Sequence, residues 1–215
     1  MTDARPPLAG LTVLVPRARD QASGFSALLR ARGAEPLEVP TIEIRPVAST
    51  AELDRAVEDL AAGRYDWVVL TSVNGVAAVR ARAEALGQAF PTGRGAVLLA
   101  RADLANPELG VLLRDKGWET NEVVAYHTVP VGALDPAARR RLDHGEVDWV
   151  AFTASSTVEG FLRGYGGPPP PGVRVAAIGP VTADTARSAG IQVATTAAEH
   201  TVGGLVAAIE HAVTT

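Results

Sequence analysis

Residues 173–190, VRVAAIGPVTADTARSAG, are the stretch of sequence that decides the fold. Residues 173–178 are almost all apolar and end at Gly179-Pro180, a pattern typical of a strand that is covered on both faces. Pro180 fits the first turn of a helix, and the residues after it favour helix until Gly190. The stretch therefore predicts a buried strand, a tight turn and a helix, as in an open α/β sheet.

The turn in this stretch is also a candidate binding site. Thr182 falls in the first turn of the predicted helix, at the carboxyl end of the buried strand. Free backbone N–H groups and the Thr182 hydroxyl would give such a crevice a partial positive charge, which favours an anion. A tight turn without a ligand explains Gly179 and Pro180 equally well when this stretch is taken alone.

Composition excludes several classes of protein. The 215 residues are 47% hydrophobic and 20% charged, as in soluble globular chains with one large domain or two small ones. The absence of Cys excludes disulfides, thiolate metal sites and a Cys nucleophile. A net charge of −4 without a basic stripe argues against nucleic-acid binding. No apolar run reaches about 18 residues and no signal peptide is evident, so we expect a cytosolic protein that does not enter membranes.

The chain contains an internal repeat. The unit at residues 11–47 returns without a gap at residues 95–131, so that Arg17-Ala18 matches Arg101-Ala102. Each copy predicts a strand, a helix and a second, alternating strand; in the first copy these are residues 11–16, 21–32 and 37–44.

A second unit is repeated as well. Residues 65–76 (YDWVVLTSVNGV) align with residues 147–158 (VDWVAFTASSTV), and each copy follows a predicted amphipathic helix, at residues 51–62 and 135–142. Both copies read as an Asp-Trp entry, a buried strand and a polar cluster that opens a helix. The chain is thus predicted to form two similar α/β lobes with parallel sheets.

The two copies are not equally complete. The second half continues with residues 173–190 and a last helix near residues 203–212, whereas in the first half only residues 88–94 precede the next repeat. About one strand–helix unit is therefore absent near residues 87–95. A natural deletion, an engineered deletion and a segment left out of the sequence as given all remain open.

The order of the units predicts the limits of the lobes. If the alternating segments are crossings, residues 37–45 and 121–131 form a two-stranded linker. One lobe then comprises residues 46–120, and a discontinuous lobe comprises residues 1–36 and 132–215. Paired extended linkers are typical of a hinge with a ligand cleft between lobes.

Polar side chains stand where the repeated strands give way to helices: Thr71, Ser72 and Asn74 in the first half, and Thr153, Ser155 and Ser156 in the second. N-capping requires the same residue types and explains either group alone. With the opening at Thr182 there are three such places, which favours an anion-binding cleft over three unrelated caps.

Three further residues are candidates for the chemistry. Arg17 and Arg101 each follow a strand and could clamp a carboxylate or phosphate, although a surface ion pair is the alternative. Tyr126 stands where the first copy has Ile42, which suggests a task for its hydroxyl; a half-buried strand tyrosine is the alternative. The four His share no metal-ligand spacing, and no nucleotide or catalytic-triad motif occurs.

Taken in order, these motifs resemble the uroporphyrinogen-III synthase family. The residues that carry the resemblance are LTVLVPRA, DWVVLTSVNGV, AYHTV, DWVAFTASSTV, and VAAIGPVTADTARSAG followed by TVGGLVAAI. They span nearly the whole chain, and their order and spacing are more specific than any one of them. The resemblance implies two flavodoxin-like lobes joined by a two-stranded linker.

The resemblance also implies an activity. Family members cyclise hydroxymethylbilane without any cofactor: they expel its hydroxyl as water and invert the terminal pyrrole ring through a spiro intermediate. Tyr126 matches the linker tyrosine placed to assist that departure, and Thr71, Ser155 and Thr182 match hydroxyl positions of the cleft. We expect a monomer that binds a linear tetrapyrrole.

The missing unit is a departure from the family pattern, because it would supply another strand–turn–helix to the cleft. A second hypothesis also stays open: a two-lobed binding protein or sensor that holds a polycarboxylate or phosphorylated metabolite without chemistry.

Overall fold

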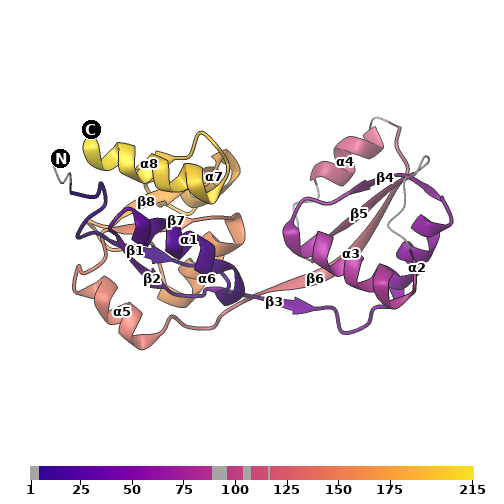
Figure 1. Cartoon of the computed structure of the whole chain (residues 1–215), viewed down its shortest axis with the longest axis horizontal. Helices are drawn as coiled ribbons and strands as arrows, with labels where there is room; N and C mark the ends of the chain where they lie inside the picture. The colour runs from indigo at the N-terminus through magenta and orange to yellow at the C-terminus, as the bar shows by residue number, and fades with distance from the viewer. Residues whose placement is uncertain (1–4, 89–95, 104–107, 116) are drawn as a thin grey trace. The chain divides into compact units, whose positions relative to one another are not determined.

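The chain folds into two compact units. The structure is a computed structural model that describes residues 5–88, 96–103, 108–115 and 117–215 (Figure 1). One unit comprises Met1–Glu43 with Pro130–Thr215 and is called lobe 1; the other comprises Ile44–Val129 and is called lobe 2. The observed boundaries thus fall inside the segments 37–45 and 121–131, where the sequence predicts the crossings.

Lobe 1 contains a five-stranded sheet in the order β2-β1-β7-β8-β9. Its strands are β1 (Thr12–Val15), β2 (Glu35–Glu38), β7 (Trp149–Phe152), β8 (Arg174–Ala177) and β9 (Thr195–Thr196). Every neighbouring pair is parallel. The strand order reverses once, between β1 and β7, and doubly wound sheets bind ligands at the carboxyl ends of their strands beside such a reversal.

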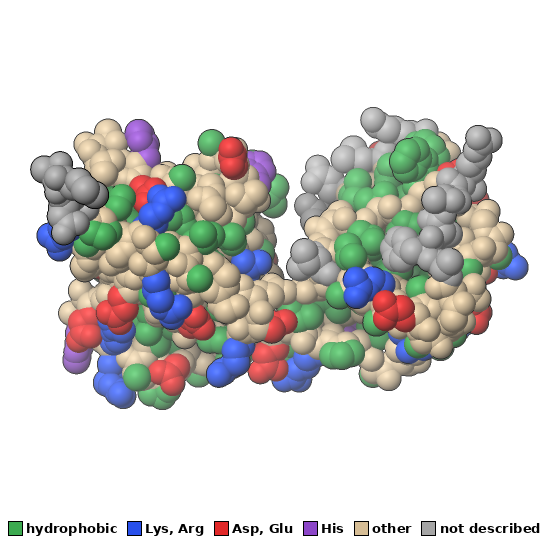
Figure 2. Space-filling view, viewed as in Figure 1, with side chains coloured by type: hydrophobic (Ala, Val, Ile, Leu, Met, Phe, Trp, Pro, Cys, Tyr) green, Lys and Arg blue, Asp and Glu red, His purple; other side chains and the backbone are tan. Residues whose placement is uncertain are grey.

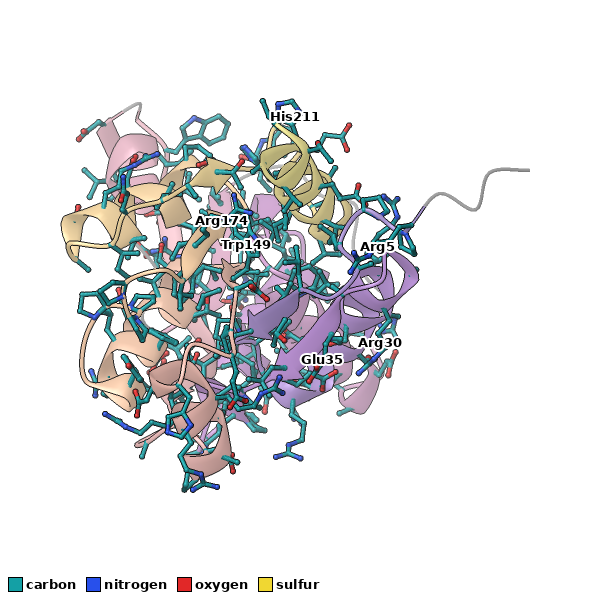
Figure 3. The ribbon with its side chains drawn as sticks, turned by 90° about the vertical axis from the view of Figure 1, so that its left-hand side faces the viewer. Arg5, Arg30, Glu35, Trp149, Arg174 and His211 are labelled. Carbon is teal, nitrogen blue, oxygen red and sulfur yellow. The ribbon has the colours of Figure 1, made fainter. Side chains whose placement is uncertain are left out.

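Helices cover both faces of this sheet. Buried side chains of α1 (Arg19–Ala31) and α8 (Val202–Thr214) pack with one face of the strands, and those of α5 (Pro136–Asp143), α6 (Ser155–Tyr165) and α7 (Pro180–Ser188) pack with the other. At the centre of the first face, Trp149 is fully buried. The Arg174 guanidinium lies 4.2 Å from the centre of its ring, and Figure 3 shows the two side chains together. The predicted two-sided cover is thus present.

Lobe 2 contains a four-stranded sheet in the order β3-β6-β5-β4. Its strands are β3 (Ile42–Pro46), β4 (Tyr65–Val69), β5 (Ala96–Ala102) and β6 (Thr120–Pro130). Strands β4, β5 and β6 are parallel. Helices α2 (Ala51–Ala61) and α3 (Val73–Ala85) build the core of one face, and Figure 1 shows α4 (Glu108–Asp115) on the other side.

Two predicted elements differ from the structure. The single strand expected over residues 37–44 is wrong: β2 ends at Glu38 in the first sheet and β3 starts at Ile42 in the second. Pro40 stands between them and has no N–H for a ladder, so the chain leaves one sheet there before it joins the other. Strand β9 was not predicted, because two residues are too short to show a pattern.

The sheets reflect the repeat. Since β5 repeats β1, β6 repeats β2 and β4 repeats β7, the order β6-β5-β4 reproduces β2-β1-β7. In lobe 1 the sheet continues with β8 and β9, whereas β4 is the last strand of the described part of lobe 2. Residues 89–95, where the missing unit would begin, lie outside the described residues. Among the helices that the structure describes, none has the length and apolar character needed to cross a membrane.

Candidate functional site

Each lobe gathers candidate residues at the carboxyl ends of its parallel strands. In lobe 1 these are the ends of β1, β7 and β8, which carry Arg17, Thr153 and Gly179; we call this the lobe 1 edge. Arg17 is half-buried, and burial lowers the pKa of its guanidinium below the ordinary value while Asp20 partly counters this. Within the described part of the chain, Arg17 has no salt bridge. A half-buried cation without a partner is suited to hold a carboxylate.

The start of α7 is built as the sequence predicts. Gly179 is the N-cap residue with extended backbone, Pro180 occupies the first helical position, and Thr182 follows in the first turn with 5% of its surface exposed. A Cβ on Gly179 would lie 3.2 Å from ring atoms of His200, so the small residue lets this imidazole approach the start of the helix. The first N–H groups of α7 are available for an anion there.

Helix α6 is capped by a residue that the sequence did not single out. Its N-cap is Ala154, and the Thr157 hydroxyl both donates to the Ala154 carbonyl (2.6 Å) and accepts from the Ala154 N–H (3.3 Å). Capping therefore does not account for Thr153, Ser155 and Ser156, all three of which are partly exposed.

Ser155 links α6 to α7. Its Oγ lies 2.7 Å from Oγ1 of Thr185, whose hydroxyl donates to the Val181 carbonyl at 2.9 Å. Because the single Thr185 proton is used in that bond, Ser155 donates to Thr185. The starts of two neighbouring helices are thereby fixed to each other at the lobe 1 edge.

Lobe 2 holds a second group of polar side chains, which we call the tyrosine cluster: Ser72, Asp103, Tyr126 and His127. Ser72 is the N-cap of α3 and accepts a hydrogen bond from the Gly75 N–H at 3.0 Å, so the capping interpretation is confirmed for this residue. Its Oγ also lies 2.8 Å from the phenol oxygen of Tyr126. Of its neighbours, Thr71 is exposed and Asn74 is partly exposed.

A β-bulge turns Tyr126 toward Ser72. Arg101 of β5 is opposite Val124 of β6, but the next residue, Ala102, is opposite Tyr126. Consecutive residues of a regular strand face opposite sides, whereas Ala125 and Tyr126 are both buried in the core beneath α2 and α3. Bulges of this kind re-aim side chains next to active sites.

Asp103 forms hydrogen bonds with β6 at and after the bulge. Its backbone N–H donates to the Tyr126 carbonyl at 3.2 Å, and its carboxylate accepts from the Thr128 N–H at 3.0 Å. The other carboxylate oxygen lies 2.9 Å from Nδ1 of His127. These bonds fix the backbone around Tyr126, so its ring position is set from both sides.

Arg101 is placed differently from its repeat partner Arg17. Its side chain is 9% exposed and forms a salt bridge with Glu122, which also pairs with Arg114 at 2.8 Å. The hydrogen bond from Arg114, followed by that from Arg101, holds the pKa of Glu122 below its usual value. To clamp a substrate carboxylate, Arg101 would have to leave this pair, and its binding role stays a prediction.

Two cavities, one in each lobe, lie at the opposite ends of the strands. One of about 450 Å³ is lined by residues 168–175 and by Gly190, Ile191, Gln192 and Ala194, next to the start of β8. Another of about 410 Å³ lies at the starts of β4, β5 and β6, between Arg64, Glu119 and Asn121. In open α/β sheets ligands bind at the carboxyl ends, so neither cavity competes with the candidate residues.

Among the residues that the structure describes, the charged side chains do not form a patch of one sign that would indicate a binding surface. Figure 2 shows Arg side chains interspersed with Asp and Glu on the visible face of lobe 1, and many of them pair, as Arg141 does with Glu35 at 2.7 Å. Within the described ranges, no group of three or more His, Cys, Asp or Glu is arranged to hold a metal ion.

Four residues with contacts at these sites are not predicted from the sequence: Asp103, His127, Thr157 and Thr185. The repeat carried a usable signal for the first two: Asp103 stands where the first copy has Arg19, and His127 where it has Glu43. The same comparison, Ile42 against Tyr126, had identified the tyrosine. Thr185 left no such signal, because the unit that contains it, residues 173–190, has no counterpart in the first half.

Sequence comparisons assign the chain to a family. It matches the family described as "Uroporphyrinogen-III synthase HemD" over residues 23–91 and 79–207. Uroporphyrinogen-III synthase of Synechococcus elongatus is 30% identical over 258 aligned positions, covering 96% of this chain and 97% of that protein. The porphyrin biosynthesis protein HemD of Ruminiclostridium josui is 27% identical, with 84% of this chain aligned to 44% of that protein.

Solved structures show the same fold. A mutant uroporphyrinogen III synthase from the extremely thermophilic bacterium Thermus thermophilus superimposes with a TM-score of 0.66 at 21% identity, over 95% of this chain and 99% of that one. The uroporphyrinogen-III synthetase of Helicobacter pylori gives a TM-score of 0.58 at 13% identity, over 92% and 97% of the two chains. The two-lobed α/β architecture with two separate sheets is therefore that of these proteins.

Proposed function

The chain belongs to the uroporphyrinogen-III synthase HemD family, and from this premise we propose which of its residues carry the reaction. Its activity is that of a uroporphyrinogen-III synthase in tetrapyrrole biosynthesis, with hydroxymethylbilane as the substrate that the family implies. The reaction needs a proton for a departing hydroxyl, binding groups for acetates and propionates, and a fixed geometry for ring closure.

Tyr126 is the proposed general acid. As the C–O bond of the hydroxymethyl group breaks, the electron pair stays on oxygen and the phenol proton completes a water molecule. The substituted carbon of the terminal pyrrole attacks the remaining azafulvene cation and forms the spiro intermediate. The earlier bond from that carbon to its methylene bridge then breaks, and the bridge bonds to the unsubstituted carbon of the same ring. That carbon loses the proton that restores the phenol. The observation that carries this assignment is the phenol of Tyr126, turned by the β-bulge onto Ser72 at the carboxyl ends of β4 and β5.

The lobe 1 edge is proposed to bind the carboxylates of the substrate. Arg17 offers a half-buried guanidinium, and the start of α7 with Gly179, Pro180 and Thr182 offers N–H groups and a hydroxyl. Further hydroxyl and amide donors are proposed at the starts of α3 and α6: Thr71, Asn74, Thr153 and Ser156. Helix starts bind anions without carrying a net charge, which agrees with the overall charge of −4.

The finer description of the fold belongs to the same proposal. We assign a flavodoxin-like arrangement to each lobe, and we infer that lobe 2 lacks the counterpart of β8 and α7. The alignment with the Synechococcus protein agrees with a missing segment, because its 258 positions exceed the 215 residues of this chain, so that protein has residues where this chain has none. The internal repeat is what assigns the missing segment to lobe 2. The lobe limits 46–120, and 1–36 with 132–215, are proposed for the rigid parts.

Product analysis tests the function. The protein is incubated with hydroxymethylbilane made enzymatically, and the oxidised products are separated by chromatography. We expect isomer III, since the enzyme must direct closure through the inverted ring, whereas spontaneous closure gives isomer I. Isomer I alone, formed at the spontaneous rate while the protein binds the tetrapyrrole, would support the alternative of a two-lobed binding protein.

A further inference from the structure

We propose that Ser72 is a positioning residue for the reaction: its hydroxyl donates a hydrogen bond to the phenol oxygen of Tyr126 and thereby directs the phenol proton toward the substrate. The inference rests on the proposed acid role of Tyr126 and adds a second residue to it. The sequence alone predicts Ser72 only as a cap or as a carboxylate ligand.

The hydroxyl groups of Ser72 and Tyr126 have one proton each, which limits how they can be hydrogen-bonded to each other. Ser72 Oγ accepts from the Gly75 N–H at 3.0 Å and lies 2.8 Å from the phenol oxygen of Tyr126. Only one of the two hydroxyl protons can lie between the oxygens. If Tyr126 gave its proton to Ser72, the phenol would have none left for the departing hydroxyl. Donation by Ser72 is the arrangement in which Tyr126 is an acid.

The start of α3 favours this direction. A hydroxyl that accepts a hydrogen bond becomes a stronger donor, so the bond from Gly75 polarises the Ser72 hydroxyl toward Tyr126. The partial positive charge at the start of a helix acts in the same sense, because it stabilises the negative charge that forms on the phenol oxygen when the proton leaves. A chain of hydrogen bonds thus runs from the Gly75 N–H through Ser72 and Tyr126 to the leaving group.

Ser72 and Tyr126, the two hydroxyl groups in this series of hydrogen bonds, are both held rigidly. A Cβ at position 75 would lie 2.9 Å from the Ala100 carbonyl oxygen, so glycine lets the start of α3 approach the end of β5 closely. On the other side, the β-bulge and the bonds of Asp103 fix Tyr126. A positioning role requires such support, since small displacements of the donor would redirect the proton.

The internal repeat provides an independent comparison. Ser72 aligns with Ala154 and Tyr126 aligns with Ile42. Ser72 and Tyr126 both belong to lobe 2 and their counterparts both belong to lobe 1, so the lobe without the phenol is also the lobe without the hydroxyl. Helix α6 nevertheless begins at the N-cap Ala154 without a side-chain bond to a first-turn N–H; the Thr157 N–H donates to the Ala154 carbonyl instead. Capping alone does not require a serine at this N-cap position, which leaves the contact with Tyr126 as the distinguishing task of Ser72.

The test compares Ser72→Ala, Ser72→Thr, Tyr126→Phe and the double variant S72A/Y126F in the full chain. We expect Ser72→Ala to lower kcat about tenfold with little change in KM, the effect of losing one hydrogen bond to a developing charge. Ser72→Thr keeps the hydroxyl and should restore most of the rate. The double variant should be no slower than Tyr126→Phe, because Ser72 acts through the phenol.

Asp135→Ala is the matched control for the loss of a cap. Asp135 is the N-cap of α5 and accepts from the N–H groups of Ala137 and Ala138, and it lies outside the proposed site. It should lose stability comparable to Ser72→Ala while kcat stays unchanged. Multiplied rate losses in S72A/Y126F, or a rise in KM with unchanged kcat in Ser72→Ala, would overturn the proposal in favour of direct substrate binding.

A readout without turnover separates this proposal from the proposed function. Tyrosine labelled with ¹³C at Cζ gives one NMR signal for each of the three tyrosines, and Tyr126→Phe identifies the signal of Tyr126. Ser72→Ala should shift that signal, and Ser72→Thr should leave it near its original place. An unmoved signal in Ser72→Ala contradicts the hydrogen bond, whether or not the wild-type protein forms isomer III.

Discussion

The two lobes start from the same sequence pattern and use it differently, as their tryptophans show. Trp149 in β7 is fully buried, with Arg174 of the neighbouring β8 stacked on its ring, whereas Trp67 at the matching position of β4 is 60% exposed. Strand β7 lies between β1 and β8, but β4 pairs only with β5 in the described sheet. The repeated Asp-Trp pattern therefore does not determine burial; the next strand of the sheet does.

A second difference concerns the start of the helix after each of these strands. In lobe 2 the capping hydroxyl belongs to the N-cap residue Ser72, and Gly75 stands three positions on; in lobe 1 the N-cap is Ala154 and the hydroxyl comes from Thr157. Ser72 accepts from a free N–H of the first turn, that of Gly75, whereas Thr157 accepts from the N–H of the N-cap residue Ala154. Only the first arrangement places a hydroxyl beside Tyr126, 2.8 Å from its phenol oxygen.

The largest effect is expected from removing the two tryptophans. Trp149→Ala should lower the free energy of unfolding by about 3–5 kcal/mol, because it empties the centre of a core, and Trp67→Ala by less than about 1 kcal/mol. Chemical denaturation of the two variants measures both. Trp149→Phe is the control: it keeps a ring in the core and removes the indole N–H, which has no hydrogen-bond partner among the described residues. Equal losses in the free energy of unfolding for Trp67→Ala and Trp149→Ala would mean that Trp67 of β4 is as well buried as Trp149.

The next effect concerns the residue that distinguishes the two crossings. Tyr126→Phe should keep the fold and product binding while lowering kcat about 10²-fold, the usual scale of general-acid assistance. The remaining activity should still give isomer III, because ring inversion depends on the geometry of the site and not on this proton. Rate and product ratio are measured together by chromatography. Full speed with a shift toward isomer I would contradict the acid role and make Tyr126 a positioning residue.

Much of the fold was predictable because the periodic elements repeat. The strand and helix in residues 173–190 are confirmed as β8 and α7, with Pro180 at the first helical position as predicted. The predicted strand over residues 37–44 failed because alternation continues across Pro40, although the chain changes sheets there. A local pattern carries no information about which sheet a strand joins.

The candidate site was predictable only in part. Residue type and position after a strand identified Arg17 and Ser72, and comparison of the repeats identified Tyr126. The ion pair of Arg101 and the bond between Ser155 and Thr185, however, join residues 21 and 30 positions apart. The β-bulge that turns Tyr126 is likewise a property of the pairing of two strands, and no residue type in β6 indicates it. Contacts of this kind depend on the tertiary structure.

The two arginines after the repeated strands offer a third contrast. Arg101→Ala should destabilise the protein by about 2 kcal/mol, since it leaves Glu122 partly buried with Arg114 alone; breaking a fully buried pair costs about 3–5 kcal/mol. Arg17→Ala should change stability by less than about 0.5 kcal/mol and weaken product binding about tenfold. Denaturation and calorimetric titration with product measure the two effects.

The pH dependence of stability checks the Arg101 prediction. Because the pKa of Glu122 is lowered in the folded state, its contribution is present above the ordinary value of about 4.3 and is lost as the pH falls below it. Arg101→Ala should weaken that loss, and Arg17→Ala should leave it unchanged. The opposite result would be a destabilised Arg17→Ala and a reduced affinity for product in Arg101→Ala. The structural role would then belong to Arg17 in lobe 1, and the binding role to Arg101 in lobe 2.

The smallest effect is expected at Thr182, whose side chain is 5% exposed at the start of α7 in lobe 1. Thr182→Ala should weaken product binding about tenfold, the lower end for a hydroxyl bonded to a charged group, and should change stability by less than the roughly 1 kcal/mol typical of a lost cap. Gly179 is the N-cap of this helix, so Thr182 is not needed to cap its start. Thr182→Ser keeps the hydroxyl and should retain the affinity. Product titrations and thermal melts of the same samples measure the two effects. A large fall in melting temperature with unchanged affinity would show that this hydroxyl stabilises the fold of lobe 1. Carboxylate binding would then be left to Arg17 and the helix start.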